Sequence, residues 1–482
     1  MGVMGVLPSA LGVTSAENFV PAKGVTKRVA EFVVHTRYAD LPADVIELGK
    51  KSILDGLGLA IASGGSVSAG ILQKYAESQA AAGVVPVLGT AKRLPLRFAA
   101  LANGTSIHLE DFDDTQLAVA SDRVYGLLMH PTVAVLPPVL GLAETMPTNG
   151  KDFMLSYHVG VEVCCKLAEA CSPRSYGDGF HSTGVFGVFG STVGCAKMRG
   201  FAVDRIARAI AIAATHAGGL RENFGTLSKP LQAGQAAEAG VVASDLAALG
   251  WDGAETVLEA NNGFFHAYGG SYDAAMLLEQ LGKPWTFSQP GVSIKPHPCG
   301  SLTHPGMTEM LRLIRAHGIK PADVVKVDVG TNTKNQTTLI HHQPKNGLQA
   351  KFSMEFSMAI LLVAGRAGLA EYTDASVNRA DVQDMIRRVH FYADPEADAA
   401  GFDKMTTIIK IQLKDGRTVA GRADFGKGSP ANPMSFEEVA EKFRECTGYA
   451  KWPAAKTAGI IAFVRDLERA PDMRALTALC SS

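Results

Sequence analysis

Apolar residues recur at helical spacing along roughly the first three-fifths of the chain. In the segment 41–58, Val45, Ile53 and Leu57 lie on one helical face, and Asp40 stands at the N-cap position in front of it. The pattern therefore predicts a helix in this segment. The same spacing predicts further helices at about 95–109, 132–146, 151–170, 184–198, 203–216 and 232–249.

These predicted helices contain many small residues, and Gly184, Gly187 and Gly190 recur at every third position. A glycine-rich loop that binds phosphate would follow a strand, and the sequence predicts no strand before this segment. Small residues instead allow two helix backbones to approach closely. We therefore predict a compact bundle of buried helices with tight contacts at these glycines.

The pattern changes in the last two-fifths of the chain. Apolar and polar residues alternate in the segment 324–330, as they do in a half-buried strand, and the segments 389–393 and 407–419 also predict strands. The last segment contains Asp415-Gly416, which predicts a hairpin turn. Helical spacing returns between and after these strands, at about 304–316, 357–368, 380–387, 434–446 and 452–469.

These patterns predict a mainly α protein with a large all-helical domain and a smaller α+β domain. The α+β domain covers residues 285–428. The helical domain covers residues 25–284 and is discontinuous, because we expect the last helices, in 429–482, to dock back on it. Residues 1–24 show no clear period and predict a flexible tail.

Composition and charge narrow the class of partner. The 482 residues are 47% hydrophobic, enough for a large core, and the formal net charge is -1. This near-neutral balance argues against nucleic acid as the main partner, because phosphate binding needs a basic excess. It also provides little repulsion between copies of the chain, which favours a homo-oligomer. No uninterrupted apolar run reaches about 18 residues, the length of a spanning helix, so we expect no membrane association.

The cysteines and the N-terminus bear on the compartment. Seven cysteines form an odd set without the paired spacing of a zinc site. We therefore expect no disulfide framework, which favours a reducing compartment. The N-terminus lacks a basic region before its apolar start, so we expect no secretory signal. Together these features predict a soluble cytoplasmic protein.

Four carboxylates lie within five residues, at Glu110, Asp111, Asp113 and Asp114, directly after a predicted helix. Neighbouring carboxylates repel one another, and the negative end of the helix dipole adds to this unfavourable energy. The cluster therefore indicates a function. The plain alternative is a solvated helix end.

A metal site is a further interpretation of this cluster, because Mg²⁺ prefers carboxylate ligands. A paired-aspartate motif would need an Asp where Ala118 stands. His108 has no second His at helical spacing that would complete a zinc site. We therefore predict no metal and no cofactor.

Two histidines stand at turns. His130 precedes Pro131, and His181 follows Gly179-Phe180 at the predicted start of a helix. A His near a helix N-terminus tends to stay neutral, which suits proton transfer near neutral pH. An isolated His is more often structural, so these contexts carry the prediction.

Two lysines adjoin prolines. Lys229 and Lys295 are thereby fixed at a loop or helix start in an otherwise apolar chain, which makes them candidates for binding a carboxylate. Arg221 and Arg123 are weaker candidates for the same task. Cys299 lies near two histidines and could be a nucleophile, but a small buried residue at a turn is the preferred interpretation.

Taken in order, these motifs resemble those of the MmgE/PrpD family, which includes 2-methylcitrate dehydratase, cis-aconitate decarboxylase and iminodisuccinate epimerase. Each motif alone is weak, but the set is specific and covers nearly the whole chain. The matching stretches are His108-Leu-Glu-Asp-Phe-Asp-Asp-Thr115, His130-Pro131, Gly179-Phe-His181, Asn223-Phe-Gly-Thr-Leu-Ser-Lys-Pro230, Lys295-Pro-His-Pro-Cys299 and Ala350-Lys-Phe-Ser-Met354.

The resemblance implies that the α+β domain forms a lid over the helical domain, with the active site in the cleft between them. It also implies a homodimer that works without metal, nucleotide or iron–sulfur cluster on a small di- or tricarboxylate. The family's active-site residues fall on Asp111, Thr115, His130, His181, Lys229 and Lys295.

The sequence departs from the decarboxylase-like members in two ways. Phe356 stands where our alignment places a Tyr of those members, and a Phe cannot donate a proton or a hydrogen bond. The spacing between Thr115 and His130 is also longer. The Phe argues against decarboxylation, and the longer spacing predicts a substrate pocket of a different shape.

The activities in this family share a carbanion next to a carboxylate, which positive charge and hydrogen-bond donors stabilise. Lys229 and Lys295 are expected to hold substrate carboxylates, with Thr115 as a hydrogen-bond donor. His130 and His181 are expected to move protons, and Asp111 to orient a histidine or act as base. A lyase like 2-methylcitrate dehydratase is the first expectation, an epimerase the second and a decarboxylase the third. A carboxylate-binding protein is the non-enzymatic alternative.

Overall fold

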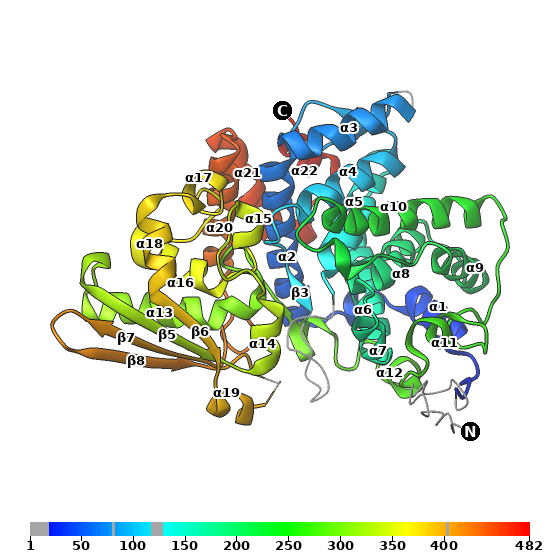
Figure 1. Ribbon diagram of the computed structural model, residues 1–482. Coiled ribbons are helices and arrows are strands. Elements are labelled where there is room, and N and C mark those ends of the chain that lie inside the picture. The colour runs from blue at the N-terminus through cyan, green and yellow to red at the C-terminus, as the bar shows by residue number, and fades with distance from the viewer. Residues whose placement is uncertain (1–18, 80–81, 117–128, 402–403) are drawn as a thin grey trace, which may run out of the picture.

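The computed structural model describes residues 19–79, 82–116, 129–401 and 404–482. A large bundle of helices and a smaller part with a four-stranded sheet stand side by side (Figure 1). The protein is therefore mainly α with a smaller α+β part, as predicted. We call residues 285–428 the lid and the other described residues the body. Most of the predicted tail lies outside the described residues, and 19–24 contain no helix or strand.

Helices in the first part of the body agree with the predicted segments to within a few residues, although the sequence analysis did not single out α1 or α3. A two-stranded sheet, β1 (Val85–Pro86) with β2 (Arg93–Leu94), accompanies them. The helices are α1 (Val25–His35), α2 (Ala43–Gly64), α3 (Val67–Gln79), α4 (Leu96–His108), α5 (Pro131–Thr145), α6 (Gly150–Ala170), α7 (Arg174–Gly177), α8 (Ser182–Met198), α9 (Val203–Ala214), α10 (Ser228–Ala248), α11 (Phe264–Gly269) and α12 (Ala274–Leu278).

Helix α8 is fully surrounded by its neighbours α5, α6 and α10. A Cβ on Gly187 would lie 2.8 Å from the Cβ of Ala134 on α5. A Cβ on Gly190 would lie 2.7 Å from the Sγ of Cys164 on α6. Both distances are too short for real carbon contacts, so the predicted role of these glycines in close helix packing is confirmed.

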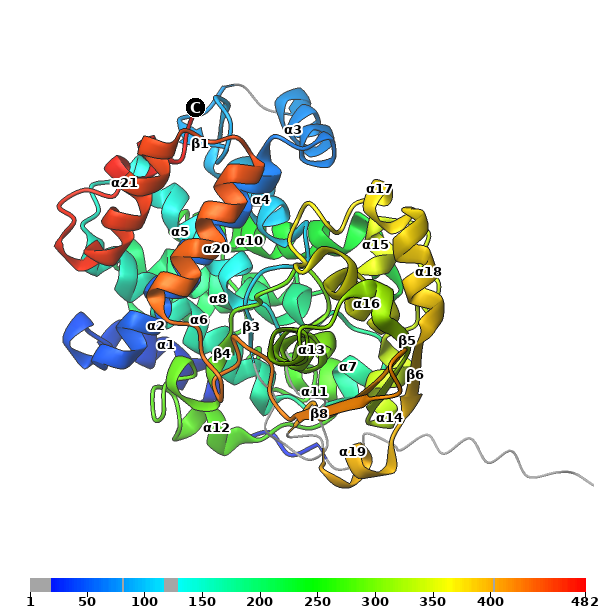
Figure 2. The same cartoon turned by 90° about the vertical axis from the view of Figure 1, so that its left-hand side faces the viewer.

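The chain returns to the body after the lid through α20 (Phe436–Tyr449), α21 (Ala454–Arg465) and α22 (Arg474–Leu479). Figure 2 shows α20 lying along α2, and the two helices pack together. A buried ion pair joins them, with Lys442 Nζ 2.6 Å from Asp55 Oδ1. Residues from these last helices belong to the same apolar cluster as the first helices.

The lid contains one mixed sheet in the order β6-β5-β7-β8, in which β5 and β6 are parallel and the other pairs antiparallel. The predicted hairpin at Asp415-Gly416 joins β7 to β8. Helices α13 and α16 pack against each other and the sheet. The lid elements are β5 (Val324–Thr331), β6 (Val389–Ala393), β7 (Thr407–Leu413), β8 (Thr418–Ala423), α13 (His304–His317), α14 (Thr333–Thr338), α15 (Gly347–Ala350), α16 (Met354–Ala364), α17 (Asp374–Val377), α18 (Ala380–Arg388) and α19 (Pro395–Ala399).

A short ladder that the sequence did not predict ties the lid to the body. β3 (Thr115–Gln116) directly follows the acidic cluster and pairs antiparallel with β4 (Val292–Ser293). This pairing brings the segment after β4, which carries Lys295, next to Asp111. The apolar cluster of the body extends to Ile294, and the cluster of the lid begins at Cys299.

All seven cysteines are buried and lie outside any disulfide, so the prediction that they form no disulfide framework is confirmed. Among the described residues, no single helix has the length and apolarity needed to cross a membrane. Helices α2 and α3 pass that test only as a pair, across a bend of 85°. Most of α2 is buried in the body.

Candidate active site

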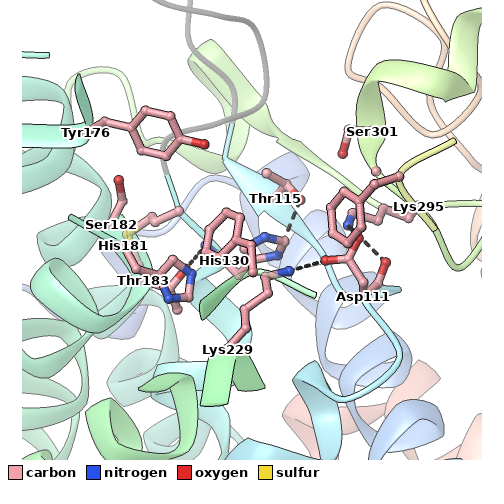
Figure 3. A pocket seen from close by; sticks show the side chains of 14 residues that line it. Asp111, Thr115, His130, Tyr176, His181, Ser182, Thr183, Lys229, Lys295 and Ser301 are labelled. Atoms are coloured by element: carbon pink, nitrogen blue, oxygen red, sulfur yellow. Dashed lines mark hydrogen bonds and ion pairs between the residues drawn. The ribbon is translucent and has the colours of Figure 1, made fainter. Parts of the chain in front are cut away.

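A cavity of about 470 Å³, including its mouth, opens where the body meets the lid. All six residues predicted for the site line it, although they are spread from residue 111 to residue 295 (Figure 3). Their distribution over several elements explains why only folding brings them together. The lining residues are Asp111, Thr115, Met129, His130, Tyr176, His181, Ser182, Thr183, Phe224, Lys229, Lys295, Gly300, Ser301 and Phe352.

Two lysines converge on Asp111. Lys229 Nζ contacts Asp111 Oδ1, and Lys295 Nζ lies 3.1 Å from Oδ2 and 2.9 Å from the main-chain oxygen of the same residue. Figure 3 shows the two side chains reaching the carboxylate from different sides. Burial alone would raise the pKa of Asp111, but the lysines outweigh it and hold this pKa well below its ordinary value.

The backbone of Asp111 has a φ of 52°, in the left-handed region. Asp tolerates this region better than most residues do, because its short polar side chain can bond locally. The conformation occurs just after α4 ends. It allows Asp111 to face the cavity while Asp113 and Asp114 face the interior of the body.

His130 is the N-cap residue of α5, and its main-chain N–H donates to Thr183 Oγ1 at 3.1 Å. Its ring Nδ1 lies 3.3 Å from Asp113 Oδ2 and 3.4 Å from Thr115 Oγ1. The same carboxylate accepts from His108 Nδ1 at 2.8 Å. Burial disfavours charge on Asp113, but the two imidazoles outweigh it and lower its pKa well below the ordinary range.

His181 is the N-cap residue of α8, and its ring Nδ1 lies 2.8 Å from Gln232 Oε1. Burial lowers the pKa of His181 well below its ordinary value, and the charges of His108 and Lys229 lower it further. The positive end of the α8 dipole acts in the same direction. His181 is therefore a neutral imidazole at neutral pH.

Asp114 lies in the layer behind the cavity. Its Oδ2 accepts from Thr132 Oγ1 at 2.5 Å, and that hydroxyl also lies 2.6 Å from Tyr157 Oη. Burial raises the pKa of Asp114 from 3.8 to about 7, because hydroxyl groups compensate the charge only in part. Asp55 nearby is also buried, and its pKa rises to about 6 against the opposing charge of Lys442.

His108, Asp113 and His130 lie close enough to share a metal ion, since one ligand atom from each falls within 4.8 Å of the others. This arrangement was not predicted, because His130 does not stand at helical spacing from His108. In the structure the Asp113 carboxylate already contacts the Nδ1 atom of each histidine. Metal independence stays a prediction.

Several residues of the site were not predicted. Tyr176 and Ser301 add hydroxyl groups to the cavity, and Phe224 and Phe352 add aromatic rings near the Lys229 ammonium group. No periodic signal marks these four in the sequence. Gln232 could have been found, because it lies one helical turn after Lys229 on α10.

The two arginines proposed as carboxylate ligands have different outcomes. The guanidinium carbon of Arg221 lies 3.8 Å from the ring centroid of Tyr176, and Arg221 Nη1 donates to the main-chain oxygen of Tyr176 at 2.8 Å. Arg221 therefore holds a cavity residue and does not line the cavity itself. Arg123 lies outside the described residues, as does most of the long spacing between Thr115 and His130.

The interpretation of Phe356 is wrong. Its side chain is fully buried in the lid core on α16, where its ring packs against Tyr372 with a centroid distance of 5.1 Å. It does not line the cavity, so it removes no hydroxyl from the site. Cys299 is also buried in the lid core, which supports its interpretation as a packed residue.

The helical body, the α+β lid and the cavity with its histidines and lysines define an acid–base enzyme. The chain belongs to the MmgE/PrpD family. Its residues 27–276 match the MmgE/PrpD N-terminal domain, and residues 297–467 match the MmgE/PrpD C-terminal domain.

Curated relatives span nearly the whole chain. It is 29% identical to the cis-aconitate decarboxylase of Homo sapiens over 95% of this chain and 94% of the relative. It is 28% identical to the enzyme of the same name from Mus musculus, over 95% and 93%. For that of Aspergillus terreus the identity is 25%, over 88% and 89%. Decarboxylases are lyases, so the comparisons identify an enzyme of the lyase type.

Proposed function

We propose that this protein is a cofactor-independent lyase that decarboxylates a small tricarboxylate of the cis-aconitate type. The observation that carries the proposal is the pair of lysines, Lys229 and Lys295, held at one side of a cavity that also contains two histidines. The names of the relatives favour decarboxylation. Phe356 no longer argues against it, because that residue lies away from the cavity.

The chemistry requires three tasks of the chain's own residues. Lys229 and Lys295 bind carboxylates that stay on the substrate, since a cation on the departing carboxylate would stabilise the reactant. When the C–C bond breaks, CO₂ leaves and the electron pair stays on the substrate. His130 then delivers one proton to carbon. Thr115 and Tyr176 donate hydrogen bonds to the negative charge that develops.

Dehydration of a hydroxy acid of the 2-methylcitrate type is the second candidate. It is favoured by the contrast between the two histidines, because one contacts a carboxylate and the other is held neutral. Elimination needs a base for the proton next to a carboxylate and an acid for the leaving hydroxyl. Epimerisation would use the same pair to exchange a proton between two faces of one carbon.

Incubation with cis-aconitate, 2-methylcitrate and iminodisuccinate in D₂O, followed by NMR, separates these reactions. Decarboxylation yields CO₂ and a product with one new C–D bond. Dehydration yields an alkene without CO₂, and epimerisation yields deuterium exchange with no loss of mass. Tight binding without turnover of any of the three would favour a carboxylate-binding protein and contradict the proposal.

A further inference from the structure

We infer that Asp113 and Gln232, which lie behind the two cavity histidines, are positioning residues that give these histidines different roles in proton transfer. Asp113 fixes His130 as the proton donor, and Gln232 fixes His181 as the neutral partner. The catalytic part of this inference rests on the proposed function. The part that concerns the ring tautomers does not.

The contact of His130 with a carboxylate determines which ring nitrogen carries a proton. An ionised carboxylate only accepts hydrogen bonds, so the Nδ1 atom that lies 3.3 Å from Asp113 Oδ2 bears hydrogen. Asp113 itself is buried, with 1% of its side chain exposed, whereas His130 is 14% exposed. The remaining ring nitrogen, Nε2, is therefore the atom available to a substrate.

The contact of His181 leads to the same tautomer, but its partner is a neutral amide and not a carboxylate. Gln232 Nε2 donates to the main-chain oxygen of Leu220 at 3.2 Å, which orients the amide so that Oε1 faces His181. A carbonyl oxygen accepts, so His181 Nδ1 carries hydrogen and Nε2 keeps its lone pair. A neutral amide provides no charge that would stabilise an imidazolium.

The other groups around the rings strengthen the division. Lys229 from α10 disfavours a positive charge on His181, and a proton taken up by His108 from α4 or by His130 at the start of α5 would do the same. His108 packs between the two rings, with centroid distances of 4.6 Å to His130 and 5.9 Å to His181. Burial lowers the pKa of His108 to about 4, so this ring stays neutral and donates to Asp113.

The tautomers are tested without substrate by ¹⁵N NMR of protein labelled at histidine, with His130→Gln and His181→Gln for assignment. We expect at pH 8 a protonated Nδ1 and an unprotonated Nε2 in His181, and a protonated Nδ1 in His130. In Gln232→Leu, which lacks the acceptor, we expect His181 to populate the Nε2-protonated tautomer as well. A proton on His181 Nε2 in the wild type would overturn the role of Gln232, whether or not the enzyme turns over any of the three acids.

The catalytic part is tested by kcat and its pH dependence. Asp113→Asn should lower kcat about 10²-fold, because the amide no longer holds the His130 ring with Nδ1 protonated. Gln232→Glu should move the acidic limb to higher pH by about one unit, because a charged His181 becomes easier to form.

Matched controls separate positioning from general damage. Asp114→Asn removes a neighbouring buried carboxyl that does not contact a cavity histidine, and Gln235→Glu adds the same charge on the exposed face of α10. Neither should move a limb of the profile. An unchanged kcat in Asp113→Asn together with an unmoved acidic limb in Gln232→Glu, with melting temperatures near that of the wild type, would overturn the division.

Discussion

Two sides of the segment that follows α4 accommodate buried carboxylates in opposite ways. On the cavity side, Asp111 contacts two lysines and its pKa is lowered. On the interior side, Asp114 contacts the hydroxyl of Thr132, and its pKa is raised to about 7. The difference shows that burial alone does not decide the charge of a carboxylate. The partner does.

The comparison also indicates what each side is for. The cavity side concentrates ionised groups at a place that a substrate can reach, so its lysines are available for exchange between Asp111 and a substrate carboxylate. The interior side keeps Asp114 bonded to a hydroxyl, and through Asp113 it holds the two histidines in place. Substitutions on one side at a time therefore separate the two roles, and loss of a cavity lysine should have the largest effect.

Lys229→Met removes one of the two cations on the cavity side while keeping a side chain of similar length. We expect kcat/KM to fall about 10³-fold, as it does when a preorganised donor to a developing negative charge is lost. Steady-state kinetics on the substrate identified by NMR measures this loss. Lys74→Met, the same change on an exposed face of α3, should leave kcat/KM within about twofold, and equal losses in both variants would remove Lys229 from the site.

Asp114→Asn changes the interior side. The unfolded carboxyl titrates near 3.8 and the folded one at about 7, so the native protein binds an extra proton between these values. This contribution to stability is present at low pH and is lost as pH rises through about 7.

The Asn variant should lack that pH dependence. Its free energy of unfolding, relative to that of the wild type, should therefore rise by roughly 2–4 kcal/mol between pH 4 and pH 8. Urea unfolding at both pH values measures the change. A parallel loss of stability at both values would contradict a raised pKa for Asp114.

Sequence alone predicted most of the helices, because apolar spacing and caps are local signals. It also predicted the lid strands and the six cavity residues, the latter through a family resemblance carried by short motifs. It did not predict the β3–β4 ladder, whose strands have two residues each and form only because the lid and the body meet. The proximity of His108 to His130 was missed for the same reason, since it depends on a contact between separate helices.

Phe356 shows what a motif alignment leaves open. An alignment places a residue in register with a relative but says nothing about which face of α16 points to the cavity. The side chain is directed into the lid core, where Tyr372 contacts it. Its chemistry therefore carries no information about the reaction.

Lys351→Met removes a contact between the lid and the segment that follows α4. Lys351 Nζ lies 2.8 Å from Glu110 Oε2 and also contacts the main-chain oxygen of Glu110, although only 4% of the lysine side chain is exposed. We expect a loss of about 1–3 kcal/mol in the free energy of unfolding, the value of buried charged hydrogen bonds. Urea denaturation measures it, with Lys345→Met on the lid surface as the control. An unchanged stability would show that this contact does not join the lid to the body.

Removal of divalent metal should have the smallest effect. After dialysis against EDTA we expect activity within about twofold of the untreated enzyme, since the Asp113 carboxylate already bonds both imidazoles. Metal analysis and activity assays on the same sample check this. Suppose instead that EDTA removes the activity and that a divalent cation restores it in the wild type but not in His108→Gln. That result would assign His108, Asp113 and His130 to a metal.

The release of CO₂ from cis-aconitate by purified, metal-depleted protein is the decisive measurement for the proposed decarboxylation. We expect one CO₂ for each molecule consumed, one deuterium on carbon in D₂O, and loss of both signals in Lys229→Met. Water loss or epimerisation without CO₂ would move the enzyme to another reaction of the same cavity. No turnover of cis-aconitate, 2-methylcitrate or iminodisuccinate by a folded wild-type protein would contradict the account.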